Sequence, residues 1–350
     1  MIVINGRFLT QPITGVQRFA IEISRKLKKI LGDKLLIISP DQIIHREIGE
    51  ELGVVTTGKL SGHLWEQIEL VRFLKKNRSP LLVNLCNTAP IRYTNKIVTL
   101  HDIAYEKFPE SFTVKFRLLY KFLVPKILST SKHVITVSEF SKKEIMEFYN
   151  LSPQKISVVY NAVNNHFKPQ KSETADKYIF ALSSNNYQKN FHSLLKAFRM
   201  LNRNDVKLIV GGGKNPRVNQ VSVQEYSQVE DNIVFTGRLT DEELIQYYSN
   251  AECFVFPSLY EGFGIPPLEA QACGCPVIAS NAASLPEILS DSAYFVNPID
   301  IAEISDAINL LINSNELKAT LIQKGFENVA RYSWEKSANK LMTIIERVCE

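Results

Sequence analysis

The chain has 350 residues, 45% of them hydrophobic and 22% charged, which is typical of soluble globular proteins and long enough for two domains. No apolar run approaches the ~18 residues that cross a bilayer, and the first residues lack the basic and apolar regions of a signal peptide. The five cysteines form no C-x-x-C pair, which argues against a disulfide framework or zinc and indicates a cytoplasmic protein.

Positive charge is concentrated in the first half of the chain. Residues 1–165 contain 24 Lys and Arg against 14 Asp and Glu, whereas the remainder has a net negative charge. A basic half fits nucleic acid, an anionic membrane surface or a phosphorylated acceptor, and an ordinary solvated surface fits equally well. No basic patch interleaved with aromatic residues supports nucleic acid, so we expect none as a partner.

The predicted elements of the first half alternate between strands and helices. Strand Met1–Asn5 breaks at Gly6, and a short loop leads to Gly15, where a helix begins. This arrangement lets a phosphate approach the helix start but lacks the G-x-G-x-x-G of dinucleotide-binding proteins, and a plain turn into a packed helix fits equally well. Further strands are predicted over residues 35–39, 54–57, 81–85, 96–100, 133–137 and 156–160, with a helix over 63–76.

Two features of the first half are candidates for function. His101 directly follows the strand over 96–100, and ligands of open α/β sheets bind at the carboxyl ends of strands, so we interpret His101 as a site residue. The stretch Phe112–Leu128 is helical, apolar and basic, and Pro125 interrupts it. It could lie on a membrane surface with its lysines toward lipid phosphates, but we expect core packing for most of its apolar side chains.

A second series of alternating strands and helices follows a polar loop that contains Pro169. We therefore predict an α/β protein with two doubly wound, Rossmann-like domains facing across a cleft. The first domain covers residues 1–165 and the second covers 166–333, while a final helix over 334–350 returns to the first domain. Strands of the second domain are predicted over residues 178–182, 206–210, 232–235, 253–257, 276–280 and 293–296.

The stretch Tyr260–Ile278, YEGFGIPPLEAQACGCPVI, carries the strongest chemical pattern. Glu261 precedes a glycine turn, two prolines mark a helix start, and Glu269 lies near the beginning of that helix. The free N–H groups and positive dipole of a helix start bind anions, and the two carboxylates can hold hydroxyl groups. A ligand with an anionic group between hydroxyl groups fits this pattern, and a nucleotide sugar is such a ligand.

With these motifs, the chain resembles the retaining GT-B glycosyltransferases of family 4, which include bacterial mannosyltransferases of surface-polysaccharide assembly. The resemblance covers nearly the whole chain, and its most specific motif is the Glu-x7-Glu spacing from Glu261 to Glu269. The order and spacing of further segments support it: TGVQRF, LHDIAYEKFPESF, VITVSEFSKKEI, KISVVYNAV, QKN, VFTGRLTDEEL and SLPEILSDSAYFVNP.

The resemblance implies roles for individual residues around a donor sugar nucleotide. Glu261 would lie by the donor sugar and Glu269 would bind the ribose hydroxyls. Lys189 would neutralise the β-phosphate, and His101 would contact the donor sugar near the reacting carbon. The remaining donor-binding candidates supply backbone groups, close approach or the border of the nucleobase: Gly262, Phe263, Gly264, Ile265, Leu268, Gly15 and Arg238.

The chain departs from the family pattern at one position. Many family members carry an arginine five or six residues before the lysine, where this chain has Ser183 and Ser184. Ser184 is retained as a donor-binding candidate, and Arg18, Ser284 or a backbone donor could replace the missing charge.

We therefore expect a retaining hexosyltransferase, with mannose favoured, that uses a GDP- or UDP-linked sugar without a cofactor or metal ion. His101, Lys189 and Glu261 are its catalytic candidates, and a covalent intermediate on Glu261 is disfavoured because the departing phosphate can take the acceptor's proton. The expected acceptor is a lipid-linked glycan of O-antigen or exopolysaccharide assembly, reached by a cytoplasmic protein at the inner membrane face. A catalytically silent nucleotide-sugar-binding module of the same fold is the alternative, and an NAD-dependent oxidoreductase is disfavoured by the missing glycine fingerprint.

Overall fold

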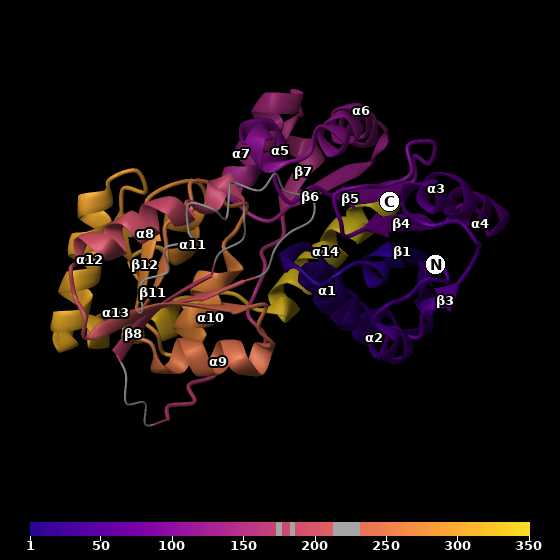
Figure 1. Cartoon of the computed structure of the whole chain (residues 1–350). Coiled ribbons are helices and arrows are strands. Elements are labelled where there is room, and N and C mark those ends of the chain that lie inside the picture. Colours follow the sequence, from indigo (N-terminus) through magenta and orange to yellow (C-terminus); the bar gives the residue numbers. More distant parts are fainter. Residues whose placement is uncertain (173–176, 183–185, 213–231) are drawn as a thin grey trace. The chain divides into compact units, whose positions relative to one another are not determined.

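A computed structural model describes residues 1–172, 177–182, 186–212 and 232–350 (Figure 1). By their internal contacts the residues form two compact units. The N-terminal unit comprises Met1–Ile103, Leu118–Asn161 and Ser333–Glu350, and the C-terminal unit comprises Ala104–Arg117 and Ala162–Tyr332. Each unit is built on one parallel sheet whose strands are joined by helical crossovers, which confirms the predicted class of two Rossmann-like domains.

The sheet of the N-terminal unit has the strand order β3-β2-β1-β4-β5-β6-β7. Strand β1 lies between β2 and β4, with Ile2 opposite both Leu35 and Leu81, so the strand order reverses at β1. Because all the pairs are parallel, the carboxyl ends of the strands share one edge, and a reversal point at that edge is where open sheets bind ligands. The strands are β1 Ile2–Asn5, β2 Leu35–Ser39, β3 Val55–Thr56, β4 Leu81–Asn84, β5 Lys96–Thr99, β6 His133–Thr136 and β7 Ile156–Val158.

Helices α1 (Gly15–Leu31) and α14 (Trp334–Cys349) pack against each other in the N-terminal unit. A capping box between Thr14 and Gln17 starts α1, and the Phe19 ring meets Trp334 edge-on at 6.2 Å between centroids. The last helix of the chain therefore packs on α1 of the N-terminal unit. The other helices are α2 Arg46–Glu51, α3 Gly62–Leu64, α4 Leu70–Lys76, α7 Glu139–Tyr149 and α6 Val114–Thr130, of which the residues from Leu118 on belong to this unit, with helical turns η1 Gly6–Thr10, η2 Gly32–Lys34, η3 Trp65–Glu69 and η5 Pro153–Lys155.

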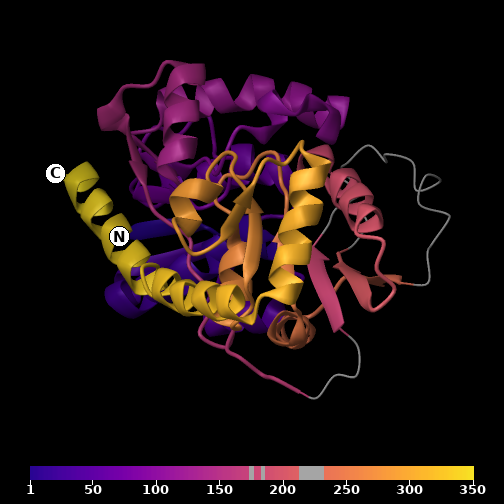
Figure 2. The same cartoon turned by 90° about the vertical axis from the view of Figure 1, so that its left-hand side faces the viewer.

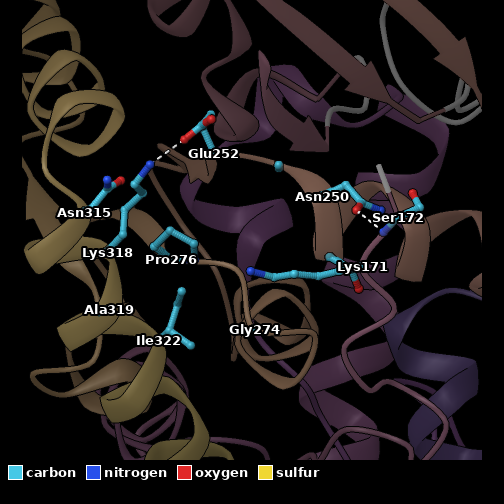
Figure 3. Close-up of a pocket in the computed structure, with 12 residues that line it drawn as sticks. Lys171, Ser172, Asn250, Glu252, Gly274, Pro276, Asn315, Lys318, Ala319 and Ile322 are labelled. Atoms are coloured by element: carbon cyan, nitrogen blue, oxygen red, sulfur yellow. Dashed lines mark hydrogen bonds and ion pairs between the residues drawn. The ribbon is translucent and has the colours of Figure 1, made fainter. Parts of the chain in front are cut away.

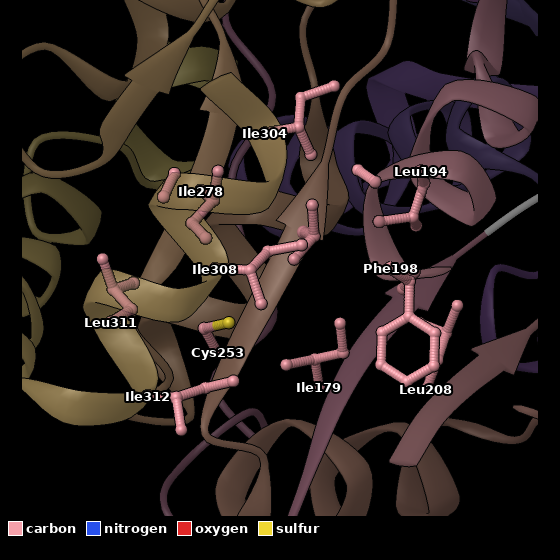
Figure 4. Packing of buried hydrophobic residues seen from close by; sticks show 14 of the residues in the cluster. Ile179, Leu194, Phe198, Leu208, Cys253, Ile278, Ile304, Ile308, Leu311 and Ile312 are labelled. Atoms are coloured by element: carbon pink, nitrogen blue, oxygen red, sulfur yellow. The ribbon is translucent and has the colours of Figure 1, made fainter. Parts of the chain in front are cut away.

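The sheet of the C-terminal unit has the order β10-β9-β8-β11-β12-β13. Its order reverses at β8, and right-handed crossovers on either side of such a point place helices on both faces. Helices α8 and α12 lie side by side (Figures 1 and 2) and pack their apolar residues onto the sheet, as Figure 4 shows for Leu194, Phe198, Ile304 and Ile308. The strands are β8 Lys177–Leu182, β9 Val206–Gly211, β10 Ile233–Gly237, β11 Cys253–Phe256, β12 Val277–Ser280 and β13 Tyr294–Val296.

Helix α10 of the C-terminal unit packs against α9 and α13, beside strands β11 and β12. A capping box from Thr240 to Glu243 starts α9, and the Ser314 side chain caps α13. The helices are α5 Ala104–Lys107, α8 Phe191–Met200, α9 Asp241–Asn250, α10 Ile265–Ala272, α11 Leu285–Leu289, α12 Ile301–Asn313 and α13 Asn315–Val329, with turns η4 Pro109–Ser111 and η6 Tyr187–Lys189.

The predicted helix over 112–128 is α6, but its apolar residues divide between core and surface. Its second half buries the side chains that we expected in the core, whereas Val114, Leu118 and Phe122 are 63%, 63% and 57% exposed. The expectation of core packing is therefore wrong for the first half, where residues spaced by four form one exposed stripe. Within the described residues, no helix combines the length and hydropathy needed to span a bilayer.

Candidate functional site

The glycine turn before α10 adopts a conformation that requires glycine. Gly264 is the residue before the helix and has a φ of +94°, and a Cβ there would lie 2.6 Å from Leu285 Cδ2. Pro266 and Pro267 occupy the first turn of α10, where their missing N–H groups leave no hydrogen bond unmade. The predicted helix start is thus present, with Ile265 as its first residue.

Ser284 holds this turn from the neighbouring loop. Its hydroxyl is fully buried and lies 2.9 Å from the carbonyl oxygen of Glu261 and 3.1 Å from that of Phe263. A hydroxyl committed to these carbonyls cannot also replace the charge of the missing arginine, so that part of the prediction is wrong. Ser284 instead fixes the backbone on both sides of Gly262.

Lys189 and Glu261, the two charged catalytic candidates of the C-terminal unit, meet in an ion pair. Lys189 Nζ donates to Glu261 Oε1 at 2.6 Å, with the side chains 23% and 13% exposed, and the ammonium lies 5.3 Å from the Phe256 ring centroid. Lys189 ends turn η6, which follows β8, whereas Glu261 follows β11, the neighbouring strand. Adjacent parallel strands thus bring together residues that are 72 positions apart.

Asn190 anchors the turn that carries Lys189. Its backbone is left-handed, with a φ of +54°, and its side-chain amide donates to the carbonyls of Pro257 at 3.0 Å and Pro298 at 2.6 Å. The backbone N–H of Leu259 also donates to the Gln188 carbonyl at 2.7 Å. These bonds fix the lysine's backbone against the loop that leads to Glu261.

Glu269 and Leu268 lie in the first half of α10 and are both buried. The Leu268 side chain belongs to the core, so only its backbone is suited to the diphosphate role that the family resemblance implies. Glu269 follows Ile265 by about one helical turn. Both residues of the Glu-x7-Glu motif are therefore near the start of α10 in the chain.

Phe108 supplies an aromatic contact beside the site. Residues Ala104–Arg117 belong to the C-terminal unit, where turn η4 packs against η6, whereas the predicted boundary placed them in the first domain with the rest of residues 1–165. The ring of Phe108 lies 5.6 Å from that of Tyr260, the residue before Glu261. Sequence reasoning missed Phe108 as a neighbour of the site, although the motif that contains it also contains His101.

His101 lies in the N-terminal unit, directly beyond β5 as predicted. Its Nε2 lies 3.0 Å from the Leu85 carbonyl, which can only accept, so Nε2 carries the proton. Phe19 packs edge-on at 5.1 Å, and the backbone N–H of His101 donates to Asn87 Oδ1 at 2.9 Å. Burial lowers the pKa of His101 to about 4, although the Leu85 carbonyl opposes this, so the imidazole is neutral at pH 7.

The remaining predicted residues are distributed over both units. Gly15 is the exposed first residue of α1, and Arg238 is exposed directly after β10, where Gly237 has a φ of +75°. Ser184, with Ser183, lies outside the described residues. Among the residues that are described, no three His, Cys, Asp or Glu side chains are grouped so that they could hold a metal ion.

A separate hollow of about 410 Å³ lies in the C-terminal unit (Figure 3). Glu252 and Pro276, which line it, directly precede β11 and β12, so the hollow lies at the amino edge of the sheet. Lys318 Nζ pairs with Glu252 at 2.5 Å across it. Lys189 and Glu261 follow the carboxyl ends of the strands, so this hollow is not part of the candidate site.

Comparison with known proteins identifies the family. Residues 13–167 match the family model Glycosyltransferase Family 4, and residues 163–328 match Glycosyl transferases group 1. The O-antigen chain mannosyltransferase RfbU of Salmonella typhimurium is 30% identical over 95% of this chain and 96% of its own length. The chain belongs to glycosyltransferase family 4. O-antigen chain mannosyltransferase B of Escherichia coli is 29% identical over 93% of both chains.

Solved structures share the fold of this glycosyltransferase. Sucrose-phosphate synthase from Thermosynechococcus elongatus aligns with a TM-score of 0.76 at 19% identity, over 99% of this chain and 98% of that one. WaaG, a glycosyltransferase involved in lipopolysaccharide biosynthesis, aligns with a TM-score of 0.72 at 14% identity over 99% of both chains. At these identities the likeness establishes the GT-B fold alone.

Proposed function

We propose that this glycosyltransferase is a retaining mannosyltransferase that acts on a lipid-linked glycan in O-antigen or exopolysaccharide assembly. The observation that carries the proposal is the near full-length similarity to two O-antigen chain mannosyltransferases, at 30% and 29% identity. The pairing of Lys189 with Glu261 near the start of α10 supports a nucleotide diphosphate sugar as the donor. The nucleotide is guanosine or uridine diphosphate.

In the proposed reaction the bond between the anomeric carbon and the phosphate oxygen breaks as the acceptor oxygen bonds to the same face of that carbon. The acceptor's proton passes to the departing phosphate oxygen, and a nucleoside diphosphate is released. Negative charge develops on the leaving phosphate, so Lys189 and the N–H groups at the start of α10 stabilise the transition state more than the bound donor. This arrangement needs no metal ion, and activity should persist in excess EDTA.

Glu261 is proposed to hold Lys189 and the donor sugar rather than to attack the sugar. Its carboxylate is shared with the lysine at 2.6 Å, which lowers its availability as a nucleophile. His101 is suited to a position near the reacting carbon because a neutral imidazole does not repel an oxocarbenium-like centre. A trapped mannosyl-enzyme on Glu261 would contradict the first of these roles.

The donor test uses the purified full chain with GDP-mannose and, separately, UDP-linked hexoses. We expect release of GDP from GDP-mannose in the presence of octyl α-mannoside as acceptor, and an α-configured product by NMR. Turnover with a UDP-sugar alone would contradict the assignment of mannose. Donor binding detected by thermal shift without nucleotide release would favour the catalytically silent module.

The exposed stripe of α6 supports contact with an anionic membrane. Val114, Leu118 and Phe122 follow one another at helical spacing, and Lys126 Nζ lies 3.3 Å from the centroid of the Phe122 ring. Apolar side chains flanked by lysines suit the boundary between acyl chains and anionic headgroups. Such a contact would bring the protein to a lipid-linked acceptor.

Membrane contact can be tested by co-sedimentation with vesicles. We expect binding to vesicles that contain phosphatidylglycerol, weakened by salt, and little binding to pure phosphatidylcholine. Replacing Leu118 and Phe122 by serine should release the protein, whereas the control Ile299→Ser, at a residue that is 75% exposed in the C-terminal unit, should not. Equal binding of both variants would contradict the assignment to α6.

A further inference from the structure

A buried polar network in the N-terminal unit takes no part in the function described above. It is organised by η3, a π-helical turn between α3 and α4 that lies in the predicted helix over 63–76. Such turns are rare and frequently occur at functional sites. The side chains of this turn bind several loops beyond the carboxyl ends of the strands.

Three of these side chains fix the loops that follow β3 and β4. Trp65 Nε1 donates to the Thr57 carbonyl at 2.7 Å, and the Glu69 carboxylate accepts from the backbone N–H of Lys59 at 3.1 Å and of Leu60 at 2.9 Å. The side-chain amide of Gln67 binds the Ala89 carbonyl and the Ile91 N–H, both at 2.9 Å. One helical turn therefore fixes both the loop after β3, which leads to α3, and the loop after β4.

The fourth side chain, Glu66, lies at the centre of the network and is fully buried. Its Oε1 is 3.3 Å from Arg7 Nε and accepts from Asn5 Nδ2 at 2.7 Å and from Thr88 Oγ1 at 3.3 Å. Arg7 Nη2 donates to Thr88 at 2.6 Å. Arg7 follows β1 and Thr88 follows β4, so the pair lies where the strand order reverses. Apolar side chains of similar volume would stabilise the fold about as well as a buried ion pair, so stability alone does not account for the Arg7–Glu66 pair.

The second carboxylate oxygen of Glu66 faces His63 and suggests that His63 contacts a ligand. Oε2 is buried and accepts no hydrogen bond from any described residue, and it faces His63 Nδ1 at 3.6 Å. The His63 side chain is 33% exposed, so it connects the buried carboxylate with solvent. Catalytic hydrogen bonds are often this long before a ligand binds and tighten in the complex.

We propose that His63 binds a hydroxyl group of the acceptor sugar, with Glu66 and Arg7 as positioning residues. Nδ1–H directed at Glu66 Oε2 leaves Nε2 as an acceptor, and a carboxylate behind an imidazole fixes this tautomer and ring orientation. A sugar hydroxyl is the complementary donor. The choice of a sugar rests on the proposed function, whereas the position rests on the carboxyl edge of the sheet, where open α/β sheets bind ligands.

The binding test is an NMR titration of the six histidines, with octyl α-mannoside as the probe and no donor present. His63→Gln assigns the His63 ring signal, which we expect to shift saturably while that of His45, bound to the Gln11 carbonyl in the same unit, stays in place. Glu66→Gln should abolish the shift in a protein that remains folded by circular dichroism. If that variant does not fold, the comparison of His63 with His45 decides alone. No shift at His63 at saturating probe overturns the proposal.

Kinetics separate this site from the donor site. His63→Gln should raise the KM for octyl α-mannoside at least tenfold and leave the KM for the donor and the rate of donor hydrolysis within twofold. His45→Gln, the control, should change none of them. An unchanged acceptor KM contradicts the role of His63. A complete lack of donor turnover in the wild type contradicts the proposed function instead, and the NMR titration still decides on the acceptor site.

Discussion

Replacing Lys189 by methionine should slow turnover far more than it destabilises the fold. The side chain keeps its length but loses the charge that pairs with Glu261 at 2.6 Å. A unit charge about 4 Å from a phosphate oxygen contributes roughly 4 kcal/mol at an effective dielectric constant of about 20. Removing one comparable oxyanion donor costs about 2.7–4 kcal/mol, so we expect kcat to fall roughly 10²–10³-fold.

Lys318→Met is a matched control for this prediction. Lys318 pairs with Glu252 at 2.5 Å, with side chains 17% and 20% exposed, in the same unit but at the opposite edge of the sheet. Both variants should lose about 1 kcal/mol or less of unfolding free energy in urea, as partly exposed pairs do. Nucleotide release should slow only in Lys189→Met. A loss of less than threefold, or an equal loss in both variants, would refute the role of the lysine charge.

Three further predictions concern the turn and the buried titratable groups. Ser284→Ala should cost about 1–3 kcal/mol of unfolding free energy and raise the donor KM, because it removes the hydrogen bond that holds the Glu261 carbonyl. Ser292 is another buried serine of the same unit, and Ser292→Ala should leave the donor KM unchanged. Burial lowers the pKa of His101 to about 4, so as pH falls the unfolded chain takes up a proton on this histidine at a higher pH than the folded protein does. The unfolding free energy should therefore fall by about 3 kcal/mol as pH drops from 6.5 to 4, and urea titrations of His101→Gln should show a flatter pH profile. Burial opposes ionisation of Glu66, but Arg7 and then His63 lower its pKa from 4.5 to about 2. The ionised carboxylate should therefore contribute about 3 kcal/mol to the unfolding free energy above pH 4.5, and this contribution should disappear toward pH 2. A pH-independent stability difference between wild type and Glu66→Gln over that range would contradict this.

Local sequence patterns predicted most of the strands and the helix starts of this protein. The apolar runs at Leu35–Ser39 and His133–Val137 became buried parallel strands within a residue of the predicted ends. Thr240 and Ser138 cap α9 and α7, and such caps can be predicted locally because the capping side chain bonds to a backbone group only three residues away. The exposed stripe of α6 was not predicted, because apolar residues at helical spacing look alike whether core or solvent covers them.

The sequence by itself determined the two-domain α/β class, the family and the Glu-x7-Glu stretch, because these depend on the order and spacing of elements and motifs along the chain. Only the tertiary structure decided that Lys189 pairs with Glu261, that Ser284 is committed to the glycine turn, and that Arg7, Glu66 and His63 form one network. Apart from the His63–Glu66 pair, which lies within one helical turn, these contacts join residues far apart in the chain, and they depend on which parallel strands are neighbours. Strand order is set by the packing of whole crossovers, which the spacing of residues within one element does not specify.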